Sequence, residues 1–318
     1  MTSFDASDAI SLAAAHGLHL SADDATVNEA GLDYRVVMAS DDTGQRWVLR
    51  VPRRDDVSSG MATEMRILDL VSPVLAEAGI AVPHWQIRAA DLIAYPALPG
   101  APGLTLTDTG EPVWHIEPAS PDYARRLGHL LARLHSLGAQ QAEAAGVEVR
   151  SPAQVRRSWR DDIDRVSEAF TVAPSLSRGW QTWLEDESCW PEHTVMTHGE
   201  IYPAHVLLDE GGAITGVLDW TTARVDDPAR DLSAQYGAAG EDMLHATIAA
   251  YAAAGGRTYP GLAAQAKQLW DASPIGYALY ALTTQAEADL TTAATLLNPV
   301  RQPQRVTTPD SPDRACSR

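Results

Sequence analysis

The feature that most constrains this chain is a cluster of polar residues placed just before a short hairpin. His198, Glu200 and His205 occur within one stretch, and Asp219 follows after two β-favouring runs. The first run covers residues 206–208, the turn covers residues 209–212, and the second run covers residues 214–218. Because antiparallel pairing returns the second strand to the start of the first, Asp219 is expected beside the loop that holds Glu200 and His205. The sequence therefore predicts a site at which three polar side chains converge.

The order of these residues indicates the chemistry. A histidine, an acid two residues later, a metal ligand five residues after that acid, and an aspartate beyond a hairpin form the layout of a kinase catalytic loop. A surface loop or a zinc centre is the alternative for the H-x-E segment. Zinc deaminases also need a P-C-x-x-C run, and the two cysteines, Cys189 and Cys316, lie far apart. The pattern favours phosphoryl transfer.

Residues 197–236 resemble the catalytic core of the macrolide 2′-phosphotransferases, within the aminoglycoside phosphotransferase superfamily. Three more segments resemble that family's nucleotide-covering loop, third strand and hinge: residues 27–35, 46–52 and 93–100. The resemblance implies an α+β, two-lobed, protein-kinase-like fold. A small β-rich nucleotide-binding lobe is expected over residues 1–98, with a hinge at 94–99. A large helical lobe with the catalytic loop and acceptor site is expected over residues 99–300, and a disordered tail over 301–318.

The scarcity of lysine identifies the cation expected to grip nucleotide phosphates. Lys267 is the only lysine, so this cation must be an arginine in the N-terminal lobe. The sequence predicts a strand at residues 34–39, a turn at 41–44 and a second strand at 47–51. Arg50 lies on the second strand, and Glu64 lies on the next helix, expected to start near residue 57, where kinases place such a pair. Arginine can hold phosphate bidentately; a surface arginine on an edge strand is the alternative.

The rest of the nucleotide site depends on the resemblance. Asn28 and Gly31 fall in the segment that resembles the phosphate-covering loop, although a single glycine is a weak signal on its own. At the hinge, proline lacks an amide donor, so Ala97 or Leu98 and not Pro96 is expected to bond the purine. The family's tendency to favour GTP over ATP is carried as an implication only.

Each polar residue of the central motif has an expected role. Asp219 is expected to bind the Mg²⁺ that bridges nucleotide phosphates, and Glu200 to orient the acceptor hydroxyl and take its proton late. His205 stands where kinases keep a metal-binding asparagine, and it either coordinates weakly or bonds phosphate or metal-bound water, since Mg²⁺ prefers oxygen. Most of the superfamily has Asp where this chain has Glu200, so its carboxylate must fold back or its loop must retreat.

Two residues are expected to support the catalytic loop. By analogy with kinases, Asp231 is expected to accept hydrogen bonds from the backbone around His198 and Gly199. His135, at the end of a helix predicted over 123–135, is interpreted as a packed or capping histidine. Further helices are predicted in the larger lobe at residues 152–170, 176–187, 228–254 and 260–296.

A macrolide acceptor needs a broad apolar cleft and a carboxylate for its dimethylammonium group. The expected acceptor residues are Tyr202, beside the base, and a group in one helical neighbourhood: Trp270, Asp271, Pro274, Tyr277 and Tyr280. Ordinary core packing is the alternative for each aromatic residue.

Composition limits the partners. A formal charge of −18 argues against nucleic acid and is compatible with a cationic substrate. The chain contains no run of about twenty apolar residues and no basic N-terminal segment, so neither a membrane span nor a signal peptide is expected. With two cysteines, a disulfide framework is not expected either. We expect a cytoplasmic protein that is monomeric.

Together these features predict an antibiotic-resistance kinase. It would transfer the γ-phosphate of GTP, or ATP, to the 2′-hydroxyl of the amino sugar of a macrolide such as erythromycin, with Mg²⁺ as cofactor. Two alternatives stay open. One is a phosphotransferase for another amino sugar or amino alcohol, and the other is a pseudokinase that binds nucleotide without turnover.

Overall fold

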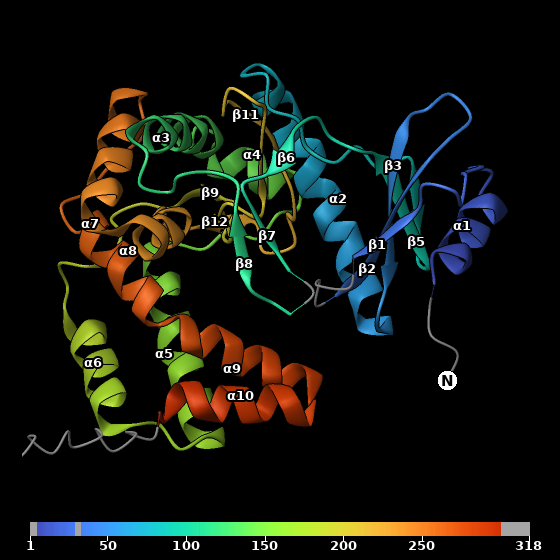
Figure 1. The fold of residues 1–318 in the computed structure, drawn as a ribbon. Helices are drawn as coiled ribbons and strands as arrows, with labels where there is room; N and C mark the ends of the chain where they lie inside the picture. The colour runs from blue at the N-terminus through green and yellow to red at the C-terminus, as the bar shows by residue number, and fades with distance from the viewer. Residues whose placement is uncertain (1–4, 29–32, 108, 300–318) are drawn as a thin grey trace, which may run out of the picture.

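A five-stranded antiparallel sheet forms the N-terminal part of the molecule (Figure 1). The computed structural model describes residues 5–28, 33–107 and 109–299. The strands stand in the order β1-β2-β3-β5-β4, and their bounds are Thr26–Asn28 (β1), Tyr34–Ser40 (β2), Arg46–Pro52 (β3), Ile87–Ala89 (β4) and Leu92–Pro96 (β5). The strands and turn expected between residues 34 and 51 are confirmed.

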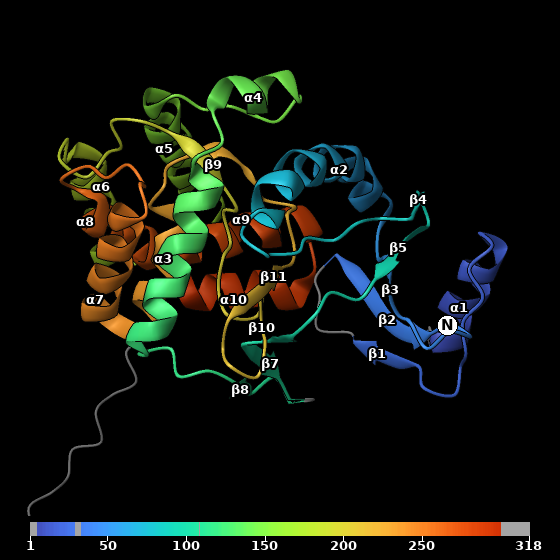
Figure 2. The same cartoon turned by 90° about the horizontal axis from the view of Figure 1, so that it is seen from above.

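Both faces of this sheet are covered, because its strands alternate side chains between two helices. Val37 and Leu49 point to one face with Ala9 and Ala13 of α1 (Ala6–Ala15). Residues on the opposite face pack with α2 (Asp55–Ala76) and continue into the main core: Tyr34, Val48, Ile93 and Tyr95. Figure 2 shows the sheet between the two helices.

Small sheets in the C-terminal part frame the predicted motif. The expected hairpin is present as β10 (Val206–Leu208) and β11 (Ile214–Val217), with β6 (Ala101–Pro102) as a third strand beside β10. The catalytic loop starts after β9 (Val195–Thr197), which pairs with β12 (Arg224–Asp226). A separate hairpin joins β7 (Leu104–Leu106) to β8 (Pro112–Trp114).

Helices make up most of the C-terminal part (Figure 1). Their bounds are Pro121–His135 (α3), Ala139–Ala144 (α4), Pro152–Ala169 (α5), Pro174–Glu185 (α6), Arg230–Ala253 (α7), Leu262–Asp271 (α8), Ser273–Thr284 (α9) and Glu287–Leu297 (α10). In α3 the hydroxyl of Ser120 accepts from the Tyr123 amide, and Pro121 fills the first turn, where its missing N–H is harmless. Within the described residues, no helix is long and apolar enough to cross a membrane.

The helix predicted over 260–296 is wrong as a single element. The chain turns at Ala272 and again at Gln285, which takes a left-handed conformation with φ of 55°, so three helices replace one. Pro274, in the first turn of α9, marks the first corner in the sequence, whereas no glycine or proline marks the corner at Gln285. The predicted helix over 228–254 is present as α7, with a break at Gly240, where φ is 79°.

The crossing of α3 and α7 depends on a missing side chain. A Cβ added at Gly128 would lie 2.7 Å from both the Thr247 carbonyl oxygen and the Tyr251 amide nitrogen, and both are backbone atoms. The same addition at Gly179, inside α6, meets nothing within 4 Å.

Gly128→Ala is therefore expected to lower the free energy of unfolding by about 1–3 kcal/mol through overpacking. Gly179→Ala should raise it by about 0.5–1 kcal/mol because alanine loses less backbone entropy in a helix. Chemical denaturation of the two variants measures both effects. Equal stability changes in both variants would contradict the close approach of the helices.

Candidate active site

The buried carboxylate of Asp231 holds the backbone of the catalytic loop through two hydrogen bonds. Asp231, at the start of α7 and 0% exposed, accepts the amide of His198 at 2.8 Å and that of Gly199 at 2.6 Å. These are the two contacts that the kinase analogy predicts. Asp231 also bonds Nε2 of His135 at 3.0 Å, and Nδ1 of His135 lies 3.1 Å from the Tyr251 hydroxyl. His135 is thus a packed histidine, as the sequence suggested.

Gly199 is needed at its position for two reasons. Its φ is +90°, in the left-handed region. A Cβ there would also lie 2.7 Å from the Arg230 guanidinium and 2.9 Å from the Thr222 carbonyl oxygen. The tight turn before Glu200 therefore depends on glycine.

The His198 ring is a neutral structural bridge. Its Nε2 donates to the carbonyl of Leu218 at 2.9 Å, and its Nδ1 accepts from the Glu200 amide at 3.3 Å. Burial lowers the pKa of His198 to about 4, which agrees with a ring that donates at one nitrogen and accepts at the other. His198 thus connects the loop to the end of the hairpin.

His205 directs one ring nitrogen at Asp219. Its Nδ1 lies 2.9 Å from the Glu200 carbonyl oxygen, which can only accept, so Nδ1 carries the proton. Its Nε2 lies 3.7 Å from Oδ2 of Asp219. The backbone joins the same two segments, because the Leu218 amide donates to the His205 carbonyl at 2.9 Å. The convergence expected from the hairpin is present.

Asp219 adopts an unusual backbone conformation. Its φ is 60°, a left-handed value that is rare for residues other than glycine and often occurs at functional sites. The Thr221 hydroxyl donates to Asp219 Oδ1 at 2.7 Å and helps to hold this turn. Burial works to raise the pKa of Asp219, but the fields of His205 and Arg50 outweigh it and leave the pKa lowered. A carboxylate is therefore the resting form.

Glu200 lies at the open side of the loop with an exposed side chain. Partial desolvation by the surrounding protein raises the pKa of its carboxyl, and Asp219 and Asp33 act in the same direction. No hydrogen bond to the Glu200 carboxylate is present among the described residues. The group is thus positioned by its backbone and remains available to an acceptor.

Arg50 and Glu64 form a buried ion pair at 2.9 Å, with side chains 9% and 2% exposed. Burial works to lower the pKa of Arg50, but Glu64, Tyr95 and Asp219 together outweigh it and leave the pKa raised. The guanidinium also stacks on the Tyr34 ring, 4.0 Å from its centroid. This position excludes the surface-arginine alternative. The Trp220 amide stabilises the Glu64 carboxylate, which ties α2 to the residue after Asp219.

One hinge expectation needs correction. The amide of Ala97 donates to the Arg46 carbonyl at 2.8 Å and extends the β3–β5 pairing, so it is not free for a purine. The Leu98 amide makes no backbone hydrogen bond within the described residues. Asn28 ends β1 opposite Val36, and Gly31 lies outside the described residues.

The residues expected at the acceptor site fall into two groups on consecutive helices. Trp270, 41% exposed, lies against Gly237 of α7, and Asp271 ends α8. On α9, after Pro274, the Tyr277 hydroxyl donates to Asp289 at 3.2 Å and its ring lies 6.0 Å from that of Tyr280. Trp270 is exposed and the two tyrosines are half-buried, and Tyr277 packs against the main core, as the core-packing alternative expects.

Tyr202 lies beside one of the reactive groups, whereas Tyr280 lies beside Tyr277. The Tyr202 ring packs edge-on against His205 at 4.5 Å, and burial raises its pKa to about 12. Burial raises the pKa of Tyr280, and the charge of Asp289 acts in the same direction.

Sequence reasoning missed several supporting residues. The Thr222 hydroxyl donates to the His198 carbonyl at 3.0 Å. Asp33 pairs with Arg54 at 2.8 Å and lies near enough to influence Glu200. Asp226 is bound by three arginines: Arg150, Arg224 and Arg230. The sequence shows three aspartates at 226–231, but their roles depend on contacts with distant segments. Asp226 binds arginines, whereas Asp231 binds the catalytic loop.

The fold and this convergence define the chain as a phosphotransferase with a kinase-like architecture. The model of the phosphotransferase enzyme family (APH) matches residues 24–264. The chain therefore belongs to that family.

Two solved structures are similar over nearly the whole length. Macrolide 2′-phosphotransferase MphH from Brachybacterium faecium shares 48% identity and a TM-score of 0.85, covering 92% of this chain and 98% of its own. A type I macrolide 2′-phosphotransferase shares 39% identity and a TM-score of 0.86, covering 94% and 99%. The protein YcbJ of Bacillus subtilis (strain 168) is 36% identical over 288 residues, 89% of this chain and 93% of its own.

The buried ion pair gives a stability prediction. Glu64→Leu leaves Arg50 buried without a partner and should cost about 3–5 kcal/mol. The double variant Arg50→Met/Glu64→Leu removes both charges and should recover most of that loss, as measured by chemical denaturation without nucleotide. Equal losses in the single and double variants would show that the unpaired charge is not the source of the destabilisation.

Proposed function

We propose that this protein transfers the γ-phosphate of GTP or ATP to the 2′-hydroxyl of a macrolide's amino sugar and so confers resistance to the antibiotic. The observation that carries the proposal is the meeting of His205 with Asp219 at the end of the hairpin, with the backbone of Glu200 bonded to the same His205 ring. Similarity over more than nine-tenths of the chain to two macrolide 2′-phosphotransferases supports the acceptor class.

In this proposal the nucleotide lies between the sheet and the hairpin. The guanidinium of Arg50 faces the α and β phosphates, and Glu64 fixes its orientation. The amide of Leu98 offers a donor to the purine, since that of Ala97 is already bonded. The segment that ends at Asn28 leads to the loop that is proposed to cover the phosphates, and the predicted role of Gly31 lies outside the described residues.

A Mg²⁺ ion fits the donor set at Asp219. Proteins bind this ion through one or two carboxylates, and substrate phosphates complete its octahedral shell. Asp219 supplies the carboxylate, and Nε2 of His205 points to the same place and can bind the ion or accept from one of its waters. No group of three potential ligands occurs in the described residues, so nucleotide oxygens are needed. When bound, the ion neutralises charge on the phosphates.

The chemical step then needs only a positioned acceptor. The 2′-oxygen forms a bond to the γ-phosphorus while the bond to the nucleoside diphosphate breaks, and the hydroxyl proton passes to Glu200. Its carboxyl is free of internal hydrogen bonds within the described structure, which leaves it able to accept that proton. The aromatic residues near the loop and on α8 and α9 form the proposed acceptor wall: Tyr202, Trp270, Tyr277 and Tyr280. Asp271 and Pro274 lie on the same segment.

The monomeric state of the protein, its place in the cytoplasm and the absence of nucleic-acid and membrane partners remain predictions.

The direct test is a mass spectrum of erythromycin after incubation with the protein, Mg²⁺ and either GTP or ATP. We expect a gain of one phosphoryl group with at least one donor, and the comparison of donors identifies the preferred nucleotide. Nucleotide binding with no mass change in erythromycin, but phosphorylation of another amino sugar, would replace the macrolide as acceptor. Failure with every acceptor would favour a pseudokinase.

Glu200 variants test the base. Glu200→Ala should lower kcat by about 10²–10⁴ while nucleotide affinity stays unchanged. Glu200→Asp should keep measurable activity, because the carboxylate is retained with one methylene fewer. Glu241→Ala, an exposed acid on α7, is the matched control and should turn over normally. Full activity in Glu200→Ala would exclude this residue as the base.

A further inference from the structure

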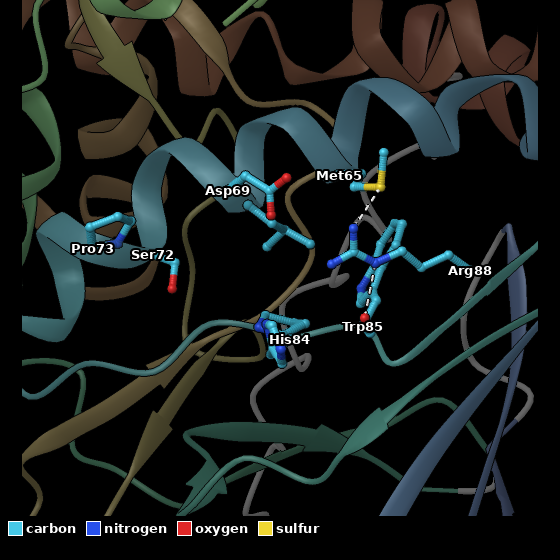
Figure 3. A pocket seen from close by; sticks show the side chains of 9 residues that line it. Met65, Asp69, Ser72, Pro73, His84, Trp85 and Arg88 are labelled. Atoms are coloured by element: carbon cyan, nitrogen blue, oxygen red, sulfur yellow. Dashed lines mark hydrogen bonds between the residues drawn. The ribbon is translucent and has the colours of Figure 1, made fainter. Parts of the chain in front are cut away.

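A cavity lies away from the catalytic loop, beside α2. It has a volume of about 190 Å³ and is bounded by α2 and by the segment that leads into β4. Its wall contains Met65, Leu68, Asp69, Ser72, Pro73, Pro83, His84, Trp85 and Arg88 (Figure 3). None of these residues belongs to the proposed nucleotide, metal or acceptor sites.

Two polar groups in this wall lack their usual partners. Pro73 lies inside α2 and has no amide hydrogen, so the carbonyl of Asp69, four residues earlier, loses its helical donor. Trp85 is 3% exposed, and its indole Nε1 is buried without an acceptor in the described part of the chain. A buried donor left unsatisfied costs about 1–3 kcal/mol, so a ligand acceptor that reaches it would recover that energy.

Opposite charges also line the cavity without neutralising each other. Arg88 donates through Nε to the Trp85 carbonyl at 2.9 Å and through Nη1 to the sulfur of Met65 at 3.0 Å, which is a weak acceptor. No ion pair joins Arg88 to Asp69 among the described residues. Figure 3 shows Arg88 beside Met65 and Trp85, with Asp69 further along the helix.

We propose that this cavity binds a small zwitterion with an apolar side chain, of the α-amino-acid class. Its carboxylate pairs with Arg88, and its ammonium lies between the side chain of Asp69 and the carbonyl of Asp69, which has no amide donor at Pro73. Its apolar side chain packs on Met65, Leu68 and Pro83. A simple anion would meet repulsion from Asp69 and a simple cation from Arg88, whereas a zwitterion matches both charges.

The site is joined to the nucleotide side through two residues. Glu64 directly precedes Met65 on α2, so the pair with Arg50 and the cavity share one helical turn. The ring of Trp85 also lies 6.0 Å from the Arg50 guanidinium. In this proposal occupation of the cavity changes the affinity for nucleotide through this helical turn, and by linkage nucleotide then changes the affinity for the zwitterion by the same factor.

Titration calorimetry of the whole protein with L-leucine tests the binding. We expect saturable millimolar binding, and no binding of isopentylamine, which lacks the carboxylate, or of 4-methylpentanoate, which lacks the ammonium. Arg88→Gln and Asp69→Asn change exposed side chains and should each weaken leucine binding at least tenfold without lowering Tm. Arg125→Gln, an exposed arginine on α3, is the control and should bind leucine normally.

Repeating the GTP titration with leucine present tests the coupling. We expect the Kd for GTP to change at least twofold in the native protein and not in Arg88→Gln. Absence of leucine binding, or binding that survives both cavity variants, overturns the site. Binding that leaves the Kd for GTP unchanged overturns the coupling to Arg50. Phosphoryl transfer to erythromycin is measured separately, so failure here does not bear on the proposed reaction.

Discussion

The carboxylate of Asp231 is the interaction on which the rest of the site depends. It is completely buried, and it holds two consecutive amides of the catalytic loop together with the His135 ring. A buried carboxylate is stable only when its oxygens are hydrogen-bonded, so the loop, α3 and α7 must meet at one point. From there His198 connects the loop to Leu218, which directly precedes Asp219. Displacing this carboxylate would release both ends of the motif.

How much could be predicted from sequence depends on how local each feature is. The hairpin, the loop and Asp219 lie within about twenty residues, and turn chemistry with strand pairing was enough to bring them together. The contact of Arg50 with Glu64 was also expected, because a strand and the next helix are adjacent in chain and space. The family and fold followed from the same motifs.

Features that depend on distant packing escaped prediction. His135 lies 96 residues before Asp231, and nothing in its helix pattern marks that contact. The amide of Ala97 donates to the carbonyl of Arg46 on the neighbouring strand, a contact that the sequence of the hinge does not reveal. The corner at Gln285 has no glycine or proline to mark it, whereas Pro274 is a local signal for the corner at Ala272. Propensity and periodicity describe a segment, whereas these features depend on what it meets.

The connector between the two parts of the molecule has a mechanical consequence. Ala101 and Pro102 are a strand of the sheet that carries the hairpin, and the Thr215 hydroxyl donates to the Pro99 carbonyl at 2.7 Å. On the other edge of the same hairpin, the Ala81 amide donates to the Thr215 carbonyl at 2.8 Å. The hairpin is thus hydrogen-bonded on both edges to segments that come from the N-terminal part. Pro96 and Pro99 stiffen the short connection from β5 to β6. These bonds on both edges of one hairpin limit how far the sheet of the N-terminal part can rotate against the loop that carries Glu200.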